Sequence, residues 1–475
     1  MKVQGIDVDT AVNAVKEQLR SDNTLSSAMR ASIELLLVLI SVLLNTLTLN
    51  SKNSSKPPSS DPNRKKNKKK GKSGRKPGGQ NGHNGSTLEK VEDPDEIVEL
   101  KIATDTLPKF RAFHEVGVET RQVIDIEINQ VVTEYRAQIL EDELGNRFVA
   151  EFPSGVTRPV QYGNNVKANA VYMSYYQMVP YERITDHFKD QLGLSLSAGT
   201  LFNFNKQAYE LLESFDGWAK KQLIEAEVMH ADETGINISS KNHWLHCAST
   251  SLVTLFFPHE KRGKEAMDAM GVLPSFNGIL CHDHWKPYFQ YQCKHALCNA
   301  HHLRELERAH EQDEQKWALL IKQFLLEANS AVLDAGGKLD DFSSKEWRKG
   351  YREILDKGDL ECPPPKEERT EGKRGRVKRS KSRNLLERLR KFEDETLRFM
   401  DSLSTPFTNN QGENDIRMTK VQQKISGCFR SLEGAQIFCR VRSFITTAKK
   451  HGVSPTTALR MLFQGKTPDF MVDSS

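Results

Sequence analysis

A run of short apolar segments near the middle of the chain limits its fold most strongly. Residues 224–239, 243–250 and 251–257 are apolar or β-branched and are joined by very short connections. This pattern predicts three antiparallel strands in a meander. A helical pattern follows at 264–270, and the apolar run at 277–285 predicts a further buried strand. We therefore expect an α/β domain built on this sheet.

The length of the chain requires more than one core. At 475 residues, with 37% hydrophobic and 28% charged residues, it is expected to contain two or three globular parts and solvated segments. Changes in composition predict a helical segment at 1–50, a basic arm or linker at 51–90, a small β module at 91–160, an α/β domain at 161–450 with a helical insertion at about 296–405, and a C-terminal tail at 451–475.

The N-terminal segment contains the apolar stretch 35–44, flanked by Glu34 and Asn45. This stretch is too short to span a bilayer, so it predicts a packing helix or a zipper-like dimer helix. The chain start lacks the pattern of a secretory signal. The seven scattered cysteines suit a reducing compartment. We therefore expect a cytoplasmic protein without membrane association.

The basic arm is the main electrostatic feature. Residues 51–90 hold twelve Lys and Arg against two acids, whereas the whole chain has a net charge of +5, so the remainder sums to −5. Its Ser, Pro, Gly and Lys content cannot bury a core. A local excess of this size predicts contacts with phosphates of a polyanion. The expected DNA-binding residues here are Arg64, Lys65, Lys66, Lys68, Lys69, Lys70, Arg75 and Lys76.

Two further segments have recognisable patterns. Alternation at 122–135 and the turn residues DELGN at 142–146 predict strands of the β module. Residues 182–212 predict a helix, a short turn and a second helix capped by Ser197. This pair is either a helix-turn-helix that reads DNA or two helices that pack on a neighbouring sheet.

Carboxylates at strand ends suggest a metal site. Asp232 and Glu233 lie in one predicted strand and Asp283 ends another. Neighbours in a strand point to opposite faces, so one of Asp232 and Glu233 faces the site, and the pattern leaves the choice open. Glu413, on a predicted helix, could join them. Three converging carboxylates form the oxygen-only site that suits Mg²⁺, although each acid alone is more commonly a solvated cap or turn residue.

Three cations follow Glu413 at helical spacing. Arg417, Lys420 and Lys424 share one side of the predicted helix with it. They could bind phosphates next to a metal held by Glu413. The alternative is an ordinary surface ion pair between Glu413 and Arg417, which would contribute little.

Several long motifs run through the chain. They are HADETG, HWLH, KRGKEAMDAMGVLP, CHDHWKPYFQYQCKHALCNAHHLREL and NNQGENDIRMTKVQQKISGCFRS, with SSKPPSSDPN and RKPGGQNGHNG in the arm. Together they resemble transposases of the Insertion Sequence 66 family. The resemblance covers about 163–445 and implies an RNase H-like, retroviral-integrase-type core with a helical insertion. It also implies that Asp232, Asp283 and Glu413 form an Asp-Asp-Glu triad with two Mg²⁺, which Mn²⁺ can replace. The implied activity is cleavage of element ends and strand transfer into target DNA.

Zinc is not expected from the sequence. Relatives carry a cysteine-bearing zinc module before the catalytic domain, but this chain has no cysteine before Cys247. The later cluster lacks the spacing of common zinc fingers. Buried thiols and a helix face are the alternative explanation of Cys281, His282, His284, Cys293, His295, Cys298, His301 and His302.

Two other functions remain open at this point. The chain could be a catalytically inactive DNA-binding protein from a decayed element, which the basic arm alone would support. It could also be a hydrolytic nuclease on the same fold that never joins strands. The partners implied by the resemblance are double-stranded DNA of element ends and target, further copies in a homo-oligomer, and accessory proteins of the same element.

Overall fold

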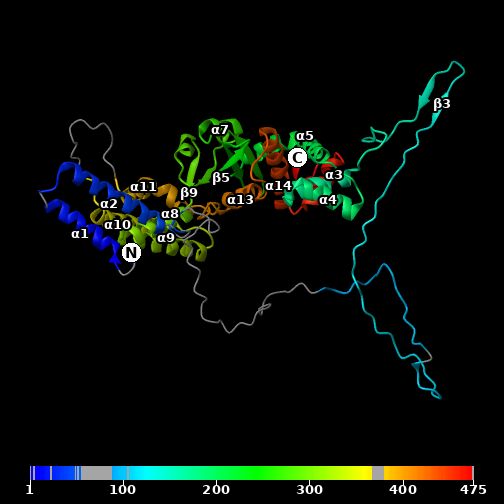
Figure 1. Cartoon of the computed structure of the whole chain (residues 1–475), viewed down its shortest axis with the longest axis horizontal. Helices are drawn as coiled ribbons and strands as arrows, with labels where there is room; N and C mark the ends of the chain where they lie inside the picture. Colours follow the sequence, from blue (N-terminus) through cyan, green and yellow to red (C-terminus); the bar gives the residue numbers. More distant parts are fainter. Residues whose placement is uncertain are drawn as a thin grey trace. The chain divides into compact units, whose positions relative to one another are not determined.

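The computed structural model describes most of the chain and divides it into two units (Figure 1). The described residues are 2–3, 6–21, 24–48, 50, 53–54, 88–103, 106–365 and 379–472. Unit 1 comprises Met1–Arg64, Glu151–Lys189 and Ser195–Ser475, and unit 2 comprises Lys65–Ala150 and Asp190–Leu194. The predicted DNA-binding residues of the arm, Arg64 to Lys76, lie outside the described residues.

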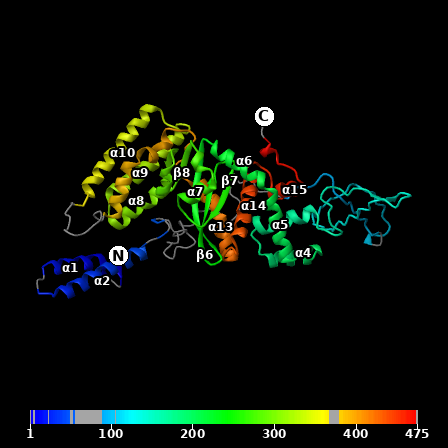
Figure 2. The same ribbon diagram turned by 90° about the horizontal axis from the view of Figure 1, so that it is seen from above.

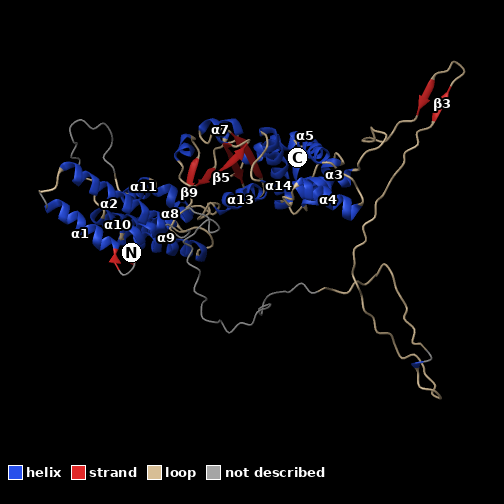
Figure 3. Cartoon of the chain, in the orientation of Figure 1, coloured by secondary structure: helices blue, strands red, loops and turns tan. Residues whose placement is uncertain are grey.

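Unit 1 contains a five-stranded mixed sheet (Figure 3). Its strands are β5 (Val228–Ile238), β6 (Lys241–Ser249), β7 (Thr254–His259), β8 (Ile279–His282) and β9 (Lys294–Leu297), in the order β7-β6-β5-β8-β9. The pairs β5–β6 and β6–β7 are antiparallel, and the pairs β5–β8 and β8–β9 are parallel. The predicted meander and the further buried strand are therefore confirmed.

The fifth strand, β9, was not expected. The sequence predicts helix from Ala296, whereas the structure places this residue in β9 and begins the next helix at Asn299. His295, Ala296 and Leu297 are buried beside β8. A buried run this short has no periodicity that separates strand from helix, so the boundary prediction was wrong.

Helices pack around this sheet. The predicted helix at 264–270 is α7 (Lys264–Met270). Helix α13 (Asn410–Ser426) contacts β5 and β6, and α14 (Leu432–Lys450) contacts β7. Between these two helices, Phe429 pairs with the end of β5, because its N–H donates to Asn237 O. Glu413 is thus carried by a helix that is anchored to the sheet at both of its ends.

The helix pair at 182–212 forms as predicted. It consists of α4 (Tyr181–Leu192) and α5 (Ala198–Leu211), and Ser197 Oγ caps α5 by accepting the N–H of Thr200. Helix α5 contacts α14, which favours the packing alternative over an exposed recognition helix. Neighbouring elements are α3 (Asn164–Val171), a π-helical turn (Tyr172–Tyr176) and α6 (Glu213–Ile224). The expected C-terminal tail instead contains α15 (Pro455–Phe463), with Ala458 and Leu459 fully buried.

The stretch between β9 and α13 is helical (Figure 2), and buried side chains give it its own core. Its helices are α8 (Asn299–Asp313), α9 (Lys316–Asp334), α10 (Asp341–Glu361), α11 (Lys381–Lys391) and α12 (Glu393–Leu397). Trp317, Tyr351 and Leu386 are buried in this core. Residues 366–378, between α10 and α11, lie outside the described residues.

Two helices form the N-terminal segment. They are α1 (Val8–Ser21) and α2 (Ser27–Thr48), and Arg30 donates to Leu19 O at 2.6 Å between them. The apolar side chains of Leu35, Leu36 and Leu43 on α2 are exposed, whereas Leu37 is buried. In the described part of the chain, no helix has both the length and the hydropathy needed to cross a membrane.

Unit 2 contains a single described hairpin, β3 (Ile139–Glu141) with β4 (Arg147–Val149). The predicted DELGN turn connects them: Asp142 accepts the N–H of Leu144 and Asn146, and Gly145 has a φ of +84°. The alternating stretch 122–135 forms no strand, and its Val123 and Val131 are exposed. Alternation predicts a strand only where one face can be buried, and the described residues of unit 2 offer this stretch no such surface.

Candidate active site

The carboxyl ends of β8 and β9 lie level with the middle of β5, which runs parallel to both strands. Val228, Met229 and His230 of β5 pair with Ile279, Leu280 and Cys281 of β8. Extending this register sets Asp232 level with Asp283. The β8–β9 register, His282 with Leu297, likewise sets Asp283 level with Cys298. Strand pairing alone therefore brings two of the predicted carboxylates and a thiol to one edge, where open α/β sheets commonly bind ligands.

The pKa of Asp232 is shifted by its burial and by the neighbouring carboxylates. Burial, followed by the charges of Glu233, Asp283 and Glu413, raises its pKa to about 8. The N–H of Glu233 donates to its Oδ1 at 2.9 Å and acts in the opposite direction. An acid held in this way retains its proton near neutral pH unless a cation compensates the negative field.

Asp283 follows β8 directly. Its Oδ1 accepts the N–H of Trp285 at 3.0 Å, and the intervening His284 has a φ of +74°. The N–H of Cys298 donates to His282 O at 2.9 Å, which fixes the start of α8 beside this turn. The aspartate is therefore held by a tight turn between two structured segments.

Glu413 lies in the first turn of α13, and Asn409 positions that turn. The Asn409 amide donates to Ala231 O of β5 at 2.9 Å, and its Oδ1 lies 2.7 Å from His230 Nδ1. Asn409 is 1% exposed. The two contacts attach the helix start to the strand residues just before Asp232, which explains how a remote helix delivers a third carboxylate.

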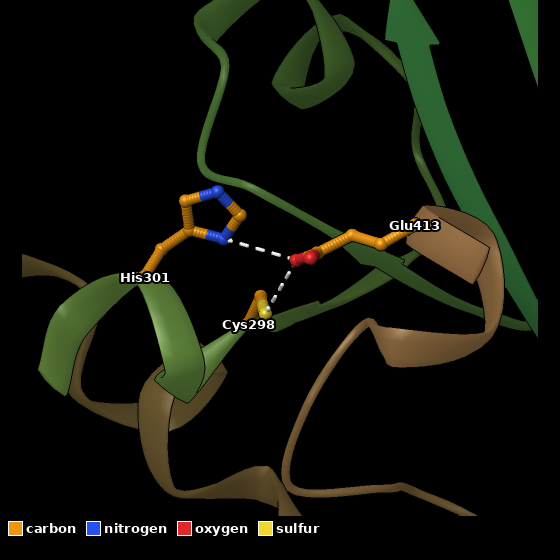
Figure 4. A group of neighbouring side chains, drawn as sticks. All are labelled: Cys298, His301 and Glu413. Atoms are coloured by element: carbon orange, nitrogen blue, oxygen red, sulfur yellow. Dashed lines mark hydrogen bonds and ion pairs between the residues drawn. The ribbon is translucent and has the colours of Figure 1, made fainter. Parts of the chain in front are cut away.

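The Glu413 carboxylate lies beside three side chains from the start of α8, and Figure 4 shows two of them, Cys298 and His301. Its Oε1 lies 3.8 Å from Cys298 Sγ, 3.6 Å from His301 Nδ1 and 3.9 Å from the Arg304 guanidinium. Burial, and then the Arg304 charge, lower the pKa of His301. None of the three appears among the site residues predicted from the sequence. The signal was the one-turn spacing of Cys298 and His301, which the crowding of cysteines and histidines obscured.

Glu233 is a fourth acid, outside the triad that the family resemblance implies. Its side chain is 1% exposed and pairs with Arg262 at 2.6 Å, while Tyr288 Oη donates to it at 2.6 Å. Arg262 also lies over the rings of Trp244 and Trp285, at 4.7 and 4.2 Å from their centroids. Burial, and then Asp283, raise the pKa of Glu233, while Tyr288 and Arg262 lower it. Glu233 is thus compensated by protein groups, unlike Asp232.

The three cations of α13 point to solvent. Arg417, Lys420 and Lys424 are exposed, and Glu413 pairs with α8 residues and not with Arg417. The alternative of a Glu413–Arg417 surface pair is therefore wrong in this structure. The cations lie on the helix that carries Glu413 and remain available to a ligand.

A further arginine reaches the site from the insertion. Burial lowers the pKa of Arg388 in α11, and the charge of Asp283 opposes this shift. Arg388 also pairs with Glu305 of α8. Its Nε and the Nε of Arg304 are buried and lack hydrogen-bond partners among the described residues. Two arginines therefore bring positive charge next to the carboxylates.

Most of the cysteine and histidine cluster is interior packing. His282 Nε2 lies 3.1 Å from His295 Nδ1, and Cys281 and Cys293 are buried free thiols. Within the described residues, the group of such side chains with metal-binding proximity is Cys298, His301 and Glu413, whose ligand atoms lie within 4.8 Å of one another.

Comparison with known families gives two matches. The model described as "Transposase IS66 family" matches residues 159–437, more than half of the chain. The model described as "Family of unknown function (DUF6444)" matches residues 6–89, which contain the N-terminal helices and the arm. No curated protein matches the chain.

Proposed function

This chain belongs to the Insertion Sequence 66 family of transposases, and from this premise we propose that it cleaves DNA at element ends and joins the ends to target DNA. Asp232, Asp283 and Glu413 are the proposed catalytic carboxylates. The observation that carries the proposal is the strand register that sets Asp232 level with Asp283, on the strand against which the helix of Glu413 packs.

The donor set fits Mg²⁺, with Mn²⁺ as a substitute. The three side chains offer hard oxygen ligands, and the raised pKa of Asp232 reflects negative charge that a divalent cation would compensate. Asp232, Asp283 and Glu413 would hold two ions, which supply activation of water or a 3′-hydroxyl and stabilisation of the leaving oxygen.

The chain's own cations bind and orient the substrate in this proposal. Arg417, Lys420 and Lys424 extend from the helix of Glu413 and contact phosphates near the scissile bond. Arg304 of α8 lies beside Glu413, and Arg388 of α11 interacts with the charge of Asp283. Their positive charges offset the repulsion between the carboxylates before the substrate binds, and they offer further phosphate contacts afterwards.

The strand order supports an RNase H-like core. Three antiparallel strands followed by two parallel strands on the other side of β5 place the first strand at the centre, with Asp232 on it. Helices α8 to α12 then form an insertion ahead of Glu413. We further propose double-stranded DNA as partner, a homo-oligomer, accessory proteins of the element, and action in the cytoplasm of a bacterial cell.

The test is cleavage and strand joining on element-end DNA with Mg²⁺. Asp232→Asn, Asp283→Asn and Glu413→Gln should each nearly abolish cleavage while retaining DNA binding in a mobility-shift assay. Glu265→Gln, which alters an exposed acid of α7, is the matched control. Full cleavage by any triad variant would remove that residue from the site. Cleavage without joined products would favour the hydrolytic nuclease.

A further inference from the structure

The surroundings of Glu413 include donors that a Mg²⁺ site does not need. Cys298 Sγ and His301 Nδ1 lie 3.8 and 3.6 Å from the same carboxylate oxygen (Figure 4). Thiolate and imidazole are ligands of softer cations such as Zn²⁺, whereas Mg²⁺ prefers oxygen alone. The two side chains therefore indicate a site, at the same edge of the sheet, that prefers a softer cation than Mg²⁺.

The distances suit a tetrahedral ion. With Zn–S of about 2.3 Å and Zn–N and Zn–O of about 2.0 Å, tetrahedral geometry separates sulfur from oxygen by about 3.5 Å and nitrogen from oxygen by about 3.3 Å. The observed separations of 3.8 and 3.6 Å exceed these values only slightly. Small side-chain adjustments would close the remaining difference, with the fourth position left for water.

The donors are also held in place. Cys298 is the N-cap residue of α8, and its sulfur accepts the N–H of Asn409 at 3.1 Å. Burial raises the pKa of this thiol to about 11, so a bound cation would have to displace its proton. His301 is one helical turn further on. Its Nδ1 is buried and has no hydrogen-bond partner among the described residues, although it lies near Glu413. The orphaned nitrogen is thus directed towards the other two donors.

We propose that Cys298, His301 and Glu413 bind Zn²⁺ or a similar thiophilic divalent cation, in competition with the Mg²⁺ that Glu413 would hold for catalysis. The competition with Mg²⁺ rests on the proposed function, whereas the binding of Zn²⁺ does not. Arg304, at 3.9 Å from the carboxylate, must yield its contact when a cation enters. The proposal replaces the sequence-based expectation of no zinc, which considered finger-like spacing and could not include a ligand 115 residues away.

Cobalt spectroscopy of the full chain tests the site without relying on catalysis. Titration with Co²⁺ should produce a thiolate-to-cobalt charge-transfer band that saturates at one equivalent of Co²⁺, and adding Zn²⁺ should remove the band. Cys298→Ser should lose the band and weaken Zn²⁺ binding by at least about 100-fold, because even outer-shell changes cost about 10–100-fold. The matched control is Cys293→Ser, another buried free thiol, which should keep the band. His301→Gln should shift the d–d bands.

Inhibition completes the test. Zn²⁺ should inhibit Mg²⁺-dependent cleavage by the wild-type protein, and Cys298→Ser should resist this inhibition relative to its own activity in Mg²⁺ alone. A missing band in the wild type, or a full band in Cys298→Ser, would overturn the proposed site even if cleavage is normal. A normal band in a protein that cannot cleave DNA would instead refute the proposed function and leave the metal site standing.

Discussion

At the scale of single residues, Asp232 and Glu233 are neighbours in β5 but differ in the groups that compensate their negative charges. Glu233 is satisfied by Arg262 and Tyr288, so its charge is a structural ion pair. Burial and the charges of Glu233, Asp283 and Glu413 raise the pKa of Asp232, and the backbone hydrogen bond from Glu233 offsets only part of this. Strand alternation predicts that the two acids diverge, but alternation alone does not say which one faces the site, because that depends on the positions of Arg262 and Tyr288 in later elements.

The uncompensated charge of Asp232 predicts a pH dependence of stability. Its pKa is about 8 in the folded protein against an ordinary value of 3.8. Between these values, the folded metal-free protein holds a proton that the unfolded chain releases. Linkage therefore lowers the free energy of unfolding as pH rises through this window. We expect the Tm of metal-free protein to fall between about pH 5 and about pH 8.

Mg²⁺ should reverse this loss. It binds the deprotonated carboxylates, so the increase in Tm on adding Mg²⁺ should be larger at about pH 8 than at about pH 5. Differential scanning calorimetry on wild type and Asp232→Asn measures both effects. The variant should show a flatter pH profile and a smaller Mg²⁺ effect. An increase in Tm that does not depend on pH would contradict the assignment of Asp232 as a metal ligand.

At the scale of elements, α13 combines anchoring with substrate contact. Its start is fixed by Asn409, its buried face includes Ile416 and Thr419, and its exposed face carries Arg417, Lys420 and Lys424. Helical spacing in the sequence predicts that these cations share a side. It does not predict that Asn409 attaches the helix to β5, because this contact joins residues far apart in the chain.

The anchoring role predicts a specific loss in Asn409→Ala. Removing the amide leaves buried polar groups of His230 and Ala231 without this partner, which should lower the free energy of unfolding by about 1–3 kcal/mol. Cleavage should fall further than this modest destabilisation explains, because Glu413 loses its positioning. Urea unfolding and cleavage assays provide the two readouts. Asn414→Ala, an exposed amide in the same helix, should leave both near wild type.

The exposed face predicts partial, salt-sensitive losses. Removing one charge-assisted phosphate contact costs about 1.5–3 kcal/mol, so Lys420→Ala and Arg417→Ala should each weaken cleavage by roughly one to two orders of magnitude. The Mg²⁺ requirement should not change, because these residues contact DNA and not metal. Lys466→Ala, an exposed lysine outside α13, is the control. Equal activity in all three variants would show that this face does not bind DNA.

At the scale of the whole molecule, the predictable parts are those with local signals. The meander, α7, the capped α5 and the helical insertion follow from periodicity, caps and turn residues. Strand β9 was not predicted, and the strands expected at 122–135 do not form. In both cases burial against distant elements decides the outcome. The same limit applies to the site. Its carboxylates stand out in sequence motifs, but Cys298, His301 and Arg304 become neighbours of Glu413 only through the fold.

The prediction for the basic arm depends on its charge alone. Residues 64–76 carry nine Lys and Arg, and each neutralised phosphate contributes roughly 0.9 to the slope of log affinity against log salt concentration. Deleting 64–76 should flatten this slope by several units, whereas shuffling the order of the same residues should preserve it, because counterion release depends on charge and not on sequence. Cleavage at saturating protein should be unchanged in both variants. An unaltered slope after deletion would identify the arm as a linker and transfer DNA binding to the α13 face.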